Sequence, residues 1–342
     1  RRDLAVLAKS VPAWLLGSAN PARGETIHLL DVDLLNAPMR DAIARLDDLA
    51  RKRGAHVAFA NPHCFNVAAK DPAYKAVLKR CDLVLPDGVG IQLACQIIGA
   101  ELRENLNGTD LLPRLCQHAQ RRGQTLYLLG AAPGVAEQAR DNLQEQYPNL
   151  TILGARDGYF EAGSDEERKV IDTIREAAPD YLLVARGVPL QERWIDEHLS
   201  ELGAGVAMGV GGLFDFTAGR IPRAPLWVRE VGLEWGWRLA QEPRRMFRRY
   251  VIGNPEFVGR VWRWHLSRTG NTLVDRYADL DHPLRRMVMD ADFQTRRWLW
   301  WVATEGTLKL KRAMDVAGAG AGLLALSPLF AATAAAIKLE DP

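Results

Sequence analysis

The sequence predicts an α/β protein: a mostly parallel sheet of Rossmann-like βαβ units, a basic helical C-terminal appendage and a terminal membrane helix. Three observations predict it. Short apolar runs that end in Gly, Pro, Asn or Asp alternate with helix-like stretches from Thr26 to Gly219. Residues 220–312 hold 19 Lys or Arg against 10 Asp or Glu, a net charge of +9 in a chain of net charge +2. An uncharged stretch of 22 residues then runs from Val316 to Ile337.

The overall composition is that of a globular protein. The 342 residues are 48% hydrophobic and 25% charged, which excludes wholesale disorder, a collagen-like rod and a multi-span membrane protein. Four cysteines without CxxC spacing predict reduced core thiols, and the seven histidines form no metal-ligand pattern, so we expect neither metal nor cofactor. The chain begins at Arg1 rather than Met and ends in Leu-Glu-Asp-Pro, and we interpret both ends as cut.

The first elements follow from apolar spacing and turn residues. Residues 26–36 predict a short strand and a turn. Apolar side chains at Ile43, Leu46 and Leu49 predict a helix from about residue 39 to residue 52. The apolar run of residues 56–62 predicts a strand that ends at Asn-Pro, followed by a helix to about residue 80.

The later elements repeat one pattern of strand, glycine turn and helix. It occurs in four further segments, residues 82–90, 125–139, 149–160 and 181–195. The last strand-like run is residues 204–219. Strands that alternate with helices are typical of βαβ units and therefore of a parallel sheet.

The candidate site residues follow the predicted strands. Ligands of such sheets bind outside the carboxyl ends of the strands, where this chain places Asn61, Asp87-Gly88, Gly130 and Gln191-Glu192. A carboxylate on the tight turn at Asp87 is suited to act as a general base, or alternatively it caps the next helix. The Gly130 turn opens a helix and favours phosphate, but it lacks the GxGxxG pattern of a nucleotide-dependent oxidoreductase. Gln191 and Glu192 are suited to bind a ribose or base hydroxyl, or alternatively they begin a helix.

The C-terminal third combines positive charge with tryptophan. Eight of the ten tryptophans follow residue 220. A basic segment of this kind indicates nucleic acid or an anionic membrane surface, and tryptophan favours the membrane because its ring settles at the headgroup level. The alternative is a solvated helical face with tryptophan packed inside.

The uncharged segment of residues 316–337 is long enough to cross a bilayer as a helix. Ser327-Pro328 interrupts it, and proline removes a backbone donor, so a re-entrant hairpin competes with a straight span. The remaining alternative is a buried Ala/Gly-rich helix of a soluble domain.

Eight sequence blocks between residues 26 and 250 resemble, in order, those of the WecG/TagA/CpsF glycosyltransferase family. They are FANPHCFN, LVLPDGVGI, NGTDLL, YLLGAAPG, LLVARGVPLQERWI, GVGGLFDFTAG, RAPLWVREVGLEWGWRL and EPRRMFRRY. The resemblance implies an inverting, metal-independent transfer of a sugar from a UDP-sugar to an undecaprenyl-diphosphate-linked sugar. It also implies action at the cytoplasmic face of the bacterial inner membrane, in the synthesis of exopolysaccharide, capsule or a teichoic-acid-type polymer.

The resemblance also implies roles for single residues. Asp87 matches the family's proposed catalytic base, Asn61 a neighbouring active-site residue, and Gln191 a glutamine of the nucleotide-sugar pocket. We assign Gly88, Gly130 and Glu192 to the same substrate-binding region. Three tail arginines match residues thought to close over the active site and to bind diphosphate, namely Arg238, Arg245 and Arg248. Many family members have Thr at the position of Phe59, which leaves the donor sugar open.

The far C-terminus resembles the start of the monotopic polyprenyl-phosphate phosphoglycosyl transferases. The matching residues are Lys311, Arg312, Asp315, Ser327 and Pro328. The catalytic Asp-Glu pair of that family lies further downstream, so we expect this chain to be the N-terminal part of a bifunctional polypeptide.

The predicted organisation has four parts. Residues 1–219 form the nucleotide-sugar-binding core, 220–250 an Arg/Trp-rich appendage that completes the active site, 251–310 a linker and 311–342 the membrane helix. The expected partners are a UDP-sugar, a polyprenyl-diphosphate-linked sugar and an anionic membrane, but not nucleic acid, and the chain is a candidate homo-oligomer. The alternative function is a non-catalytic UDP-sugar-binding or scaffold module that presents a membrane-anchored transferase.

Overall fold

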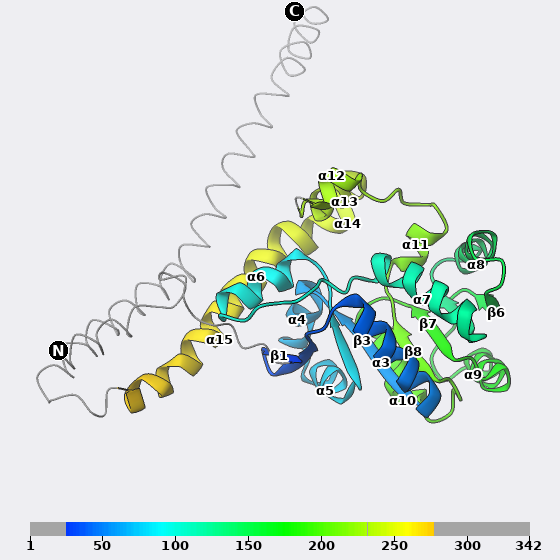
Figure 1. Cartoon of the computed structure of the whole chain (residues 1–342), viewed down its shortest axis with the longest axis horizontal. Helices are drawn as coiled ribbons and strands as arrows, with labels where there is room; N and C mark the ends of the chain where they lie inside the picture. Colours follow the sequence, from blue (N-terminus) through cyan, green and yellow to red (C-terminus); the bar gives the residue numbers. More distant parts are fainter. Residues whose placement is uncertain (1–24, 231, 277–342) are drawn as a thin grey trace, which may run out of the picture. The chain divides into compact units, whose positions relative to one another are not determined.

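The computed structural model describes residues 25–230 and 232–276 (Figure 1). Its centre is a parallel sheet of six strands in the order β4-β3-β8-β7-β5-β6. The strands are β3 (Ala55–Ala60), β4 (Leu83–Pro86), β5 (Thr125–Gly130), β6 (Thr151–Arg156), β7 (Tyr181–Ala185) and β8 (Val206–Gly209). The predicted α/β class and parallel sheet are therefore confirmed.

Helices cover both faces of this sheet. Apolar side chains of α3 (Met39–Lys52), α7 (Gly108–Arg122) and α8 (Val135–Gln146) share one buried cluster with the strands. Those of α9 (Asp165–Ala177) and α10 (Leu190–His198) share a second cluster. The remaining helices of the core are α4 (Pro62–Ala68), α5 (Pro72–Arg80), α6 (Val89–Ile97) and α11 (Leu213–Thr217).

Two local predictions need correction. Residues 26–36 form an antiparallel hairpin of β1 (Thr26–Leu29) and β2 (Val32–Leu35), not one strand and a turn. The hairpin is possible because Leu30 and Asp31 take φ angles of 50° and 68°, as a tight two-residue turn requires. The single helix expected up to residue 80 is divided into α4 and α5, because Asp71 caps α5 and a proline occupies its first turn.

The appendage consists of short helices, as predicted. These are α12 (Leu226–Glu230), α13 (Glu234–Gln241), α14 (Pro243–Phe247) and the π-helix η1 (Arg248–Ile252), after which α15 (Gly253–Arg276) begins. Core and appendage belong to one compact unit that ends at Val261, and a second unit begins at Trp262. The part of the predicted linker that the structure describes is helical, because α15 extends to Arg276.

The membrane prediction concerns residues that the structure does not describe. Within residues 25–230 and 232–276, no helix is both long and apolar enough to span a bilayer. The segment of residues 316–337 lies outside the described residues, and so do its predicted landmarks Lys311, Arg312, Asp315, Ser327 and Pro328.

Candidate active site

Asp87 and Asn61 meet at the carboxyl ends of two neighbouring strands. Asn61 follows β3 and caps α4, because its Oδ1 accepts the backbone N–H groups of His63 (3.1 Å) and Cys64 (3.3 Å). Its Nδ2 donates to Asp87 Oδ2 at 3.2 Å. Since the cap fixes which end of the amide faces outward, Asn61 presents a donor to Asp87. The structure thus brings together the two residues predicted to be catalytic.

The turn after Asp87 is held by the core. Gly88, not Asp87, occupies the N-cap position of α6 and has a φ of 91°, which favours glycine. Its N–H donates to Asn105 Oδ1 at 2.8 Å, so this donor is already used by the protein. Asp87 accepts a hydrogen bond from Asn61 and does not cap α6, so the alternative interpretation of Asp87 as a helix cap is wrong.

The surroundings of Asp87 raise its pKa. The carboxyl is half-buried, and loss of hydration is the main reason that its pKa lies above the usual value. The hydrogen bond from Asn61 and the positive charges of Arg249 and Arg238 oppose this rise, whereas the negative charge of Asp110 adds to it. A carboxyl with a raised pKa is a better proton acceptor at neutral pH than a fully hydrated one.

The appendage supplies two arginines to this carboxyl, Arg238 from α13 and Arg249 from η1. The guanidinium of Arg238 is mostly buried, lies 5.1 Å above the ring of Phe216 and is 3.5 Å from Glu242. The predicted Arg245 instead pairs with Glu242 at 3.0 Å and remains 60% exposed.

The prediction missed Arg249 because of a change in helix type. Arg245 and Arg248 share a face if the α-helix continues, but α14 ends at residue 247 and a π-helix follows. A π-turn contains more residues per turn than an α-turn, which rotates the side chains that follow. Arg248 is exposed, and Arg249 is the residue whose charge acts on Asp87 and on His63.

Gln191 joins two glycine loops instead of lining an open surface. Its side chain is 2% exposed, and Oε1 accepts the N–H groups of Gly187 (3.1 Å) and Gly211 (2.9 Å). Its Nε2 donates to Glu192 Oε1 at 2.7 Å. The loops after β7 and β8 are therefore fixed to each other at the carboxyl ends of the strands.

Glu192 lies behind Gln191, in the interior. It is fully buried, and its Oε2 has no hydrogen-bond partner in the part of the chain that the structure describes. Burial raises the pKa of this carboxyl to about 7, although the hydrogen bond from Gln191 opposes the rise. The substrate contact predicted for Glu192 is thus replaced by a supporting contact to Gln191.

The raised pKa of Glu192 makes stability depend on pH. The folded protein retains a proton on Glu192 that the unfolded chain loses near pH 4.5, so the contribution of Glu192 to the free energy of unfolding falls as pH rises from about 4.5 through about 7. His56 and His63, whose burial lowers their pKa values to about 4, contribute in the opposite sense over the same range. We therefore expect Glu192→Gln to remove only the contribution of Glu192, and so to stabilise the protein by about 3 kcal/mol at pH 8 relative to the parent. Urea unfolding at pH 5 and pH 8 measures this change in the free energy of unfolding, with Glu197→Gln as the exposed control on the same helix. If the free energy of unfolding changes with pH equally in the parent and in Glu192→Gln, the raised pKa of Glu192 is contradicted.

Gly130 serves the packing of the sheet. It ends β5 with a φ of 132°, and a Cβ there would come within 2.5 Å of the carbonyl oxygen of Ala185 on β7. Only glycine fits this close approach. The predicted phosphate contact of Gly130 therefore concerns its backbone alone.

An open surface depression of about 500 Å³ lies beside the ends of β5, β6 and β7, toward the opposite edge of the sheet from β4 and Asp87. It is lined by residues 158–161, 164 and 166, among them Tyr159, which is 70% exposed. Arg186, which follows β7, lies 4.0 Å above the ring of Phe160 and holds that wall in place. No local sequence pattern marks Tyr159, whose exposed ring is apparent only in the structure.

Metal ligands do not accompany these residues. Among the residues that the structure describes, no group of three or more His, Cys, Asp or Glu is arranged to hold a metal ion.

Comparison with known proteins gives the family. The model of the glycosyl transferase WecG/TagA/CpsF family matches residues 27–271. A relative from Bacillus spizizenii is 31% identical over 239 residues, which cover 69% of this chain and 91% of the relative. A relative from Staphylococcus aureus strain MW2 is 30% identical over 225 residues, which cover 65% of this chain and 87% of the relative. Both relatives are described as N-acetylglucosaminyldiphosphoundecaprenol N-acetyl-beta-D-mannosaminyltransferase.

The family match spans the six-stranded sheet, the turn that carries Asp87 and the arginines of the appendage. The family model and the relatives thus agree on one kind of protein. The chain belongs to the WecG/TagA/CpsF family and is a glycosyltransferase.

Proposed function

We propose that this glycosyltransferase moves a sugar from a UDP-sugar to the hydroxyl of an undecaprenyl-diphosphate-linked sugar, with inversion at the anomeric carbon. The observation that carries the proposal is the position of Asp87, a half-buried carboxyl at a strand end between the Asn61 amide and the Arg238 and Arg249 charges. The relatives' names supply the first substrate pair to test, N-acetylmannosamine as the transferred sugar and undecaprenyl-diphospho-N-acetylglucosamine as acceptor.

Asp87 acts as the general base. It accepts the proton of the acceptor hydroxyl while the oxygen of that hydroxyl forms the new bond to the anomeric carbon and the bond to UDP breaks. Asn61 donates to one carboxylate oxygen, which leaves the other oxygen for the acceptor. The amide therefore orients the base without protonating it.

The UDP-sugar donor lies along the carboxyl ends of the central strands and of β6. An exposed aromatic ring such as Tyr159 offers a stacking surface to a uracil base at the depression beside β6. The diphosphate then lies across the glycine loops that Gln191 joins, toward Asp87. Arg238 and Arg249 offset the negative charge that develops on the departing UDP.

A panel of UDP-sugars with undecaprenyl-diphospho-N-acetylglucosamine tests the proposal. We expect one donor to yield a disaccharide-lipid product and free UDP in equal amounts, with the β-anomer formed from an α-linked donor. Failure of every donor, or release of UDP without transfer, would contradict it. Because Phe59 leaves the donor sugar open, the panel includes N-acetylglucosamine, glucose and uronic acid donors.

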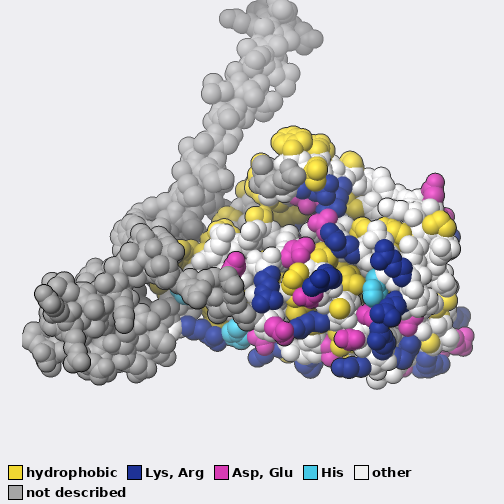
Figure 2. Space-filling view, in the orientation of Figure 1, with side chains coloured by type: hydrophobic (Ala, Val, Ile, Leu, Met, Phe, Trp, Pro, Cys, Tyr) yellow, Lys and Arg dark blue, Asp and Glu magenta, His cyan; other side chains and the backbone are white. Residues whose placement is uncertain are grey.

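The appendage also presents an apolar surface suited to a bilayer. Leu226 and Trp227 of α12 are 61% and 67% exposed, and hydrophobic side chains gather at this end of the molecule (Figure 2). Exposed arginines 244, 245 and 248 follow in the same appendage. We propose that this surface contacts the anionic cytoplasmic leaflet, where tryptophan and arginine bind together.

We expect the double variant Leu226→Ala/Trp227→Ala to bind phosphatidylglycerol vesicles about tenfold more weakly than the parent, because it loses buried apolar area in the interface. Vesicle co-sedimentation measures this, with Leu153→Ala as the control for an exposed leucine in the core. Equal binding by the parent and the double variant would contradict the assignment of this surface.

A further inference from the structure

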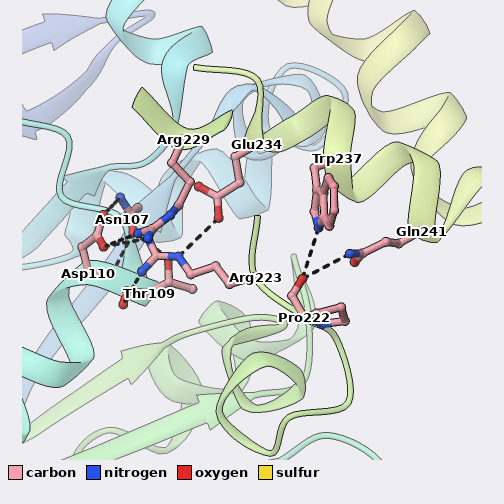
Figure 3. A network of polar contacts seen from close by, with 9 residues as sticks. All are labelled: Asn107, Thr109, Asp110, Pro222, Arg223, Arg229, Glu234, Trp237 and Gln241. Carbon is pink, nitrogen blue, oxygen red and sulfur yellow. Dashed lines mark hydrogen bonds and ion pairs between the residues drawn. The ribbon is translucent and has the colours of Figure 1, made fainter. Parts of the chain in front are cut away.

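A polar network joins the start of α7 to the appendage (Figure 3). Asp110 lies in the first turn of α7, and Asn107 caps that helix. The side chain of Asn107 accepts the Asp110 N–H (2.9 Å) and the Thr109 hydroxyl (2.8 Å), and it donates to Asp110 Oδ2 (2.7 Å). One oxygen of Asp110 is therefore fixed by the core.

The other oxygen of Asp110 faces the appendage. Oδ1 is 2.6 Å from the Arg223 guanidinium and 3.9 Å from that of Arg229. Burial alone would raise the pKa of Asp110, but the hydrogen bonds from Asn107 and Arg223 and the arginine charges hold it below its usual value. Asp110 is therefore a carboxylate that binds core and appendage at once.

Arg223 extends this contact to α13. Its guanidinium also lies 3.5 Å from Glu234 Oε1 and 3.4 Å from the carbonyl oxygen of Thr109. The preceding carbonyl, that of Pro222, accepts from Trp237 Nε1 (3.4 Å) and Gln241 Nε2 (3.2 Å) of the same helix. Residues 222 and 223 are thus bonded to α13 along its length and to α7 through Asp110.

The positions of Arg238 and Arg249 relative to Asp87 depend on the position of α13. Glu234 and Arg238 are four residues apart on α13 and share a face. The ring of Trp235 contacts that of Tyr250 at 6.2 Å, which connects α13 to η1 beside Arg249. A contact that fixes Glu234 therefore also limits where Arg238 and Arg249 can lie.

We propose that Asp110 is a positioning residue, which through Arg223 and Arg229 latches the appendage to the start of α7 so that Arg238 and Arg249 face Asp87. This inference rests on the proposed function, in which those arginines act on the reacting diphosphate. The latch joins residues 113 positions apart in the sequence.

Asp110→Asn tests the latch in two ways. We expect trypsin to cleave the appendage at arginines 244–249 about fivefold faster, because a partly exposed ion-pair network is lost. We also expect kcat to fall, because Arg238 and Arg249 no longer face the reacting diphosphate. Asp110→Glu, which keeps the charge, should restore part of the resistance to trypsin and part of kcat. The double variant Asp110→Asn/Arg223→Gln should be cleaved no faster, and turn over no more slowly, than the more affected single variant.

The pH profile separates a latch from a mere neighbouring charge. If Asp110 acts only as a nearby negative charge, its removal lowers the pKa of Asp87 and moves activity to lower pH. If it is a latch, Arg238 and Arg249 move away, the pKa of Asp87 rises, and activity moves to higher pH. A shift to lower pH, or unchanged trypsin cleavage, would overturn the proposal.

Arg168→Gln is the matched control, because Arg168 pairs with Glu201 at 2.6 Å on another part of the surface. We expect it to leave both trypsin cleavage of the appendage and turnover at parental values. If the parent transfers no sugar at all, the proposed function fails. The cleavage rates of Asp110→Asn and of the double variant still decide whether the latch exists.

Discussion

Replacing Asp87 by Asn is expected to lower kcat about a thousandfold, because an amide cannot accept the proton of the acceptor hydroxyl. The change preserves the size of the side chain, so the fold and the affinity for UDP should persist. Turnover with the lipid acceptor, together with calorimetric titration of UDP, measures the two effects separately. Asp141→Asn, an exposed carboxylate on α8 paired with Arg140, is the control for the loss of one negative charge.

The pH dependence of the parent gives a second check on Asp87. The base must be deprotonated, so kcat/KM should rise with pH through the pKa of Asp87, which lies above the usual range of an aspartate. That rise should be missing from the residual activity of Asp87→Asn. A parent profile that is flat across acidic pH, or an Asp87→Asn variant as fast as the parent, would eliminate Asp87 as the base.

The second large effect is expected for Arg249→Met, with turnover falling about a hundredfold because the leaving UDP loses a positive partner. Removing this charge also raises the pKa of Asp87, so the activity profile should move to higher pH. The pKa of His63 provides a measurement that does not depend on catalysis. Burial, and secondarily Arg249, hold its pKa at about 4, and the variant should raise that value in an NMR titration.

Two neighbouring arginines make the Arg249 test specific. Arg244→Met removes the same charge from an exposed position and should leave the pKa of His63 where it is. Arg248→Met distinguishes the two assignments of the site, because the family resemblance points to Arg248 and the structure to Arg249. A larger loss of turnover in Arg248→Met than in Arg249→Met would show that the structural assignment is wrong.

The sheet could be predicted because each strand carries its own signal. Apolar runs ended by Asn-Pro, Pro-Asp-Gly or Gly mark β3, β4 and β5 without reference to the rest of the chain. The hairpin of β1 and β2 is only half predictable, because its turn begins with Leu30, a residue that is not typical of left-handed backbone, and contains no glycine. The division between α4 and α5 has a local signal, because Asp71 is a helix-capping residue and Pro72 is favoured at the first helical position.

The site was predicted where chemistry follows directly from a strand end, and not where it depends on distant contacts. Asp87 and Asn61 meet because parallel neighbouring strands end at the same edge. Arg249 depends on a π-helix, and Arg223 meets Asp110 across 113 positions of sequence. No local pattern encodes either contact. Glu192 was misplaced because a polar side chain at a helix start gives no sign that the helix turns it inward.

The four cysteines have a practical consequence. Cys64, Cys95 and Cys116 are buried, Cys81 is partly so, and burial raises the pKa of every one of them, that of Cys64 to about 12. At neutral pH almost none of these sulfurs is a thiolate, and alkylating reagents attack only the thiolate. Maleimide reagents should therefore label the native protein only slowly, and a single exposed cysteine introduced elsewhere on its surface would carry nearly all of an attached fluorophore.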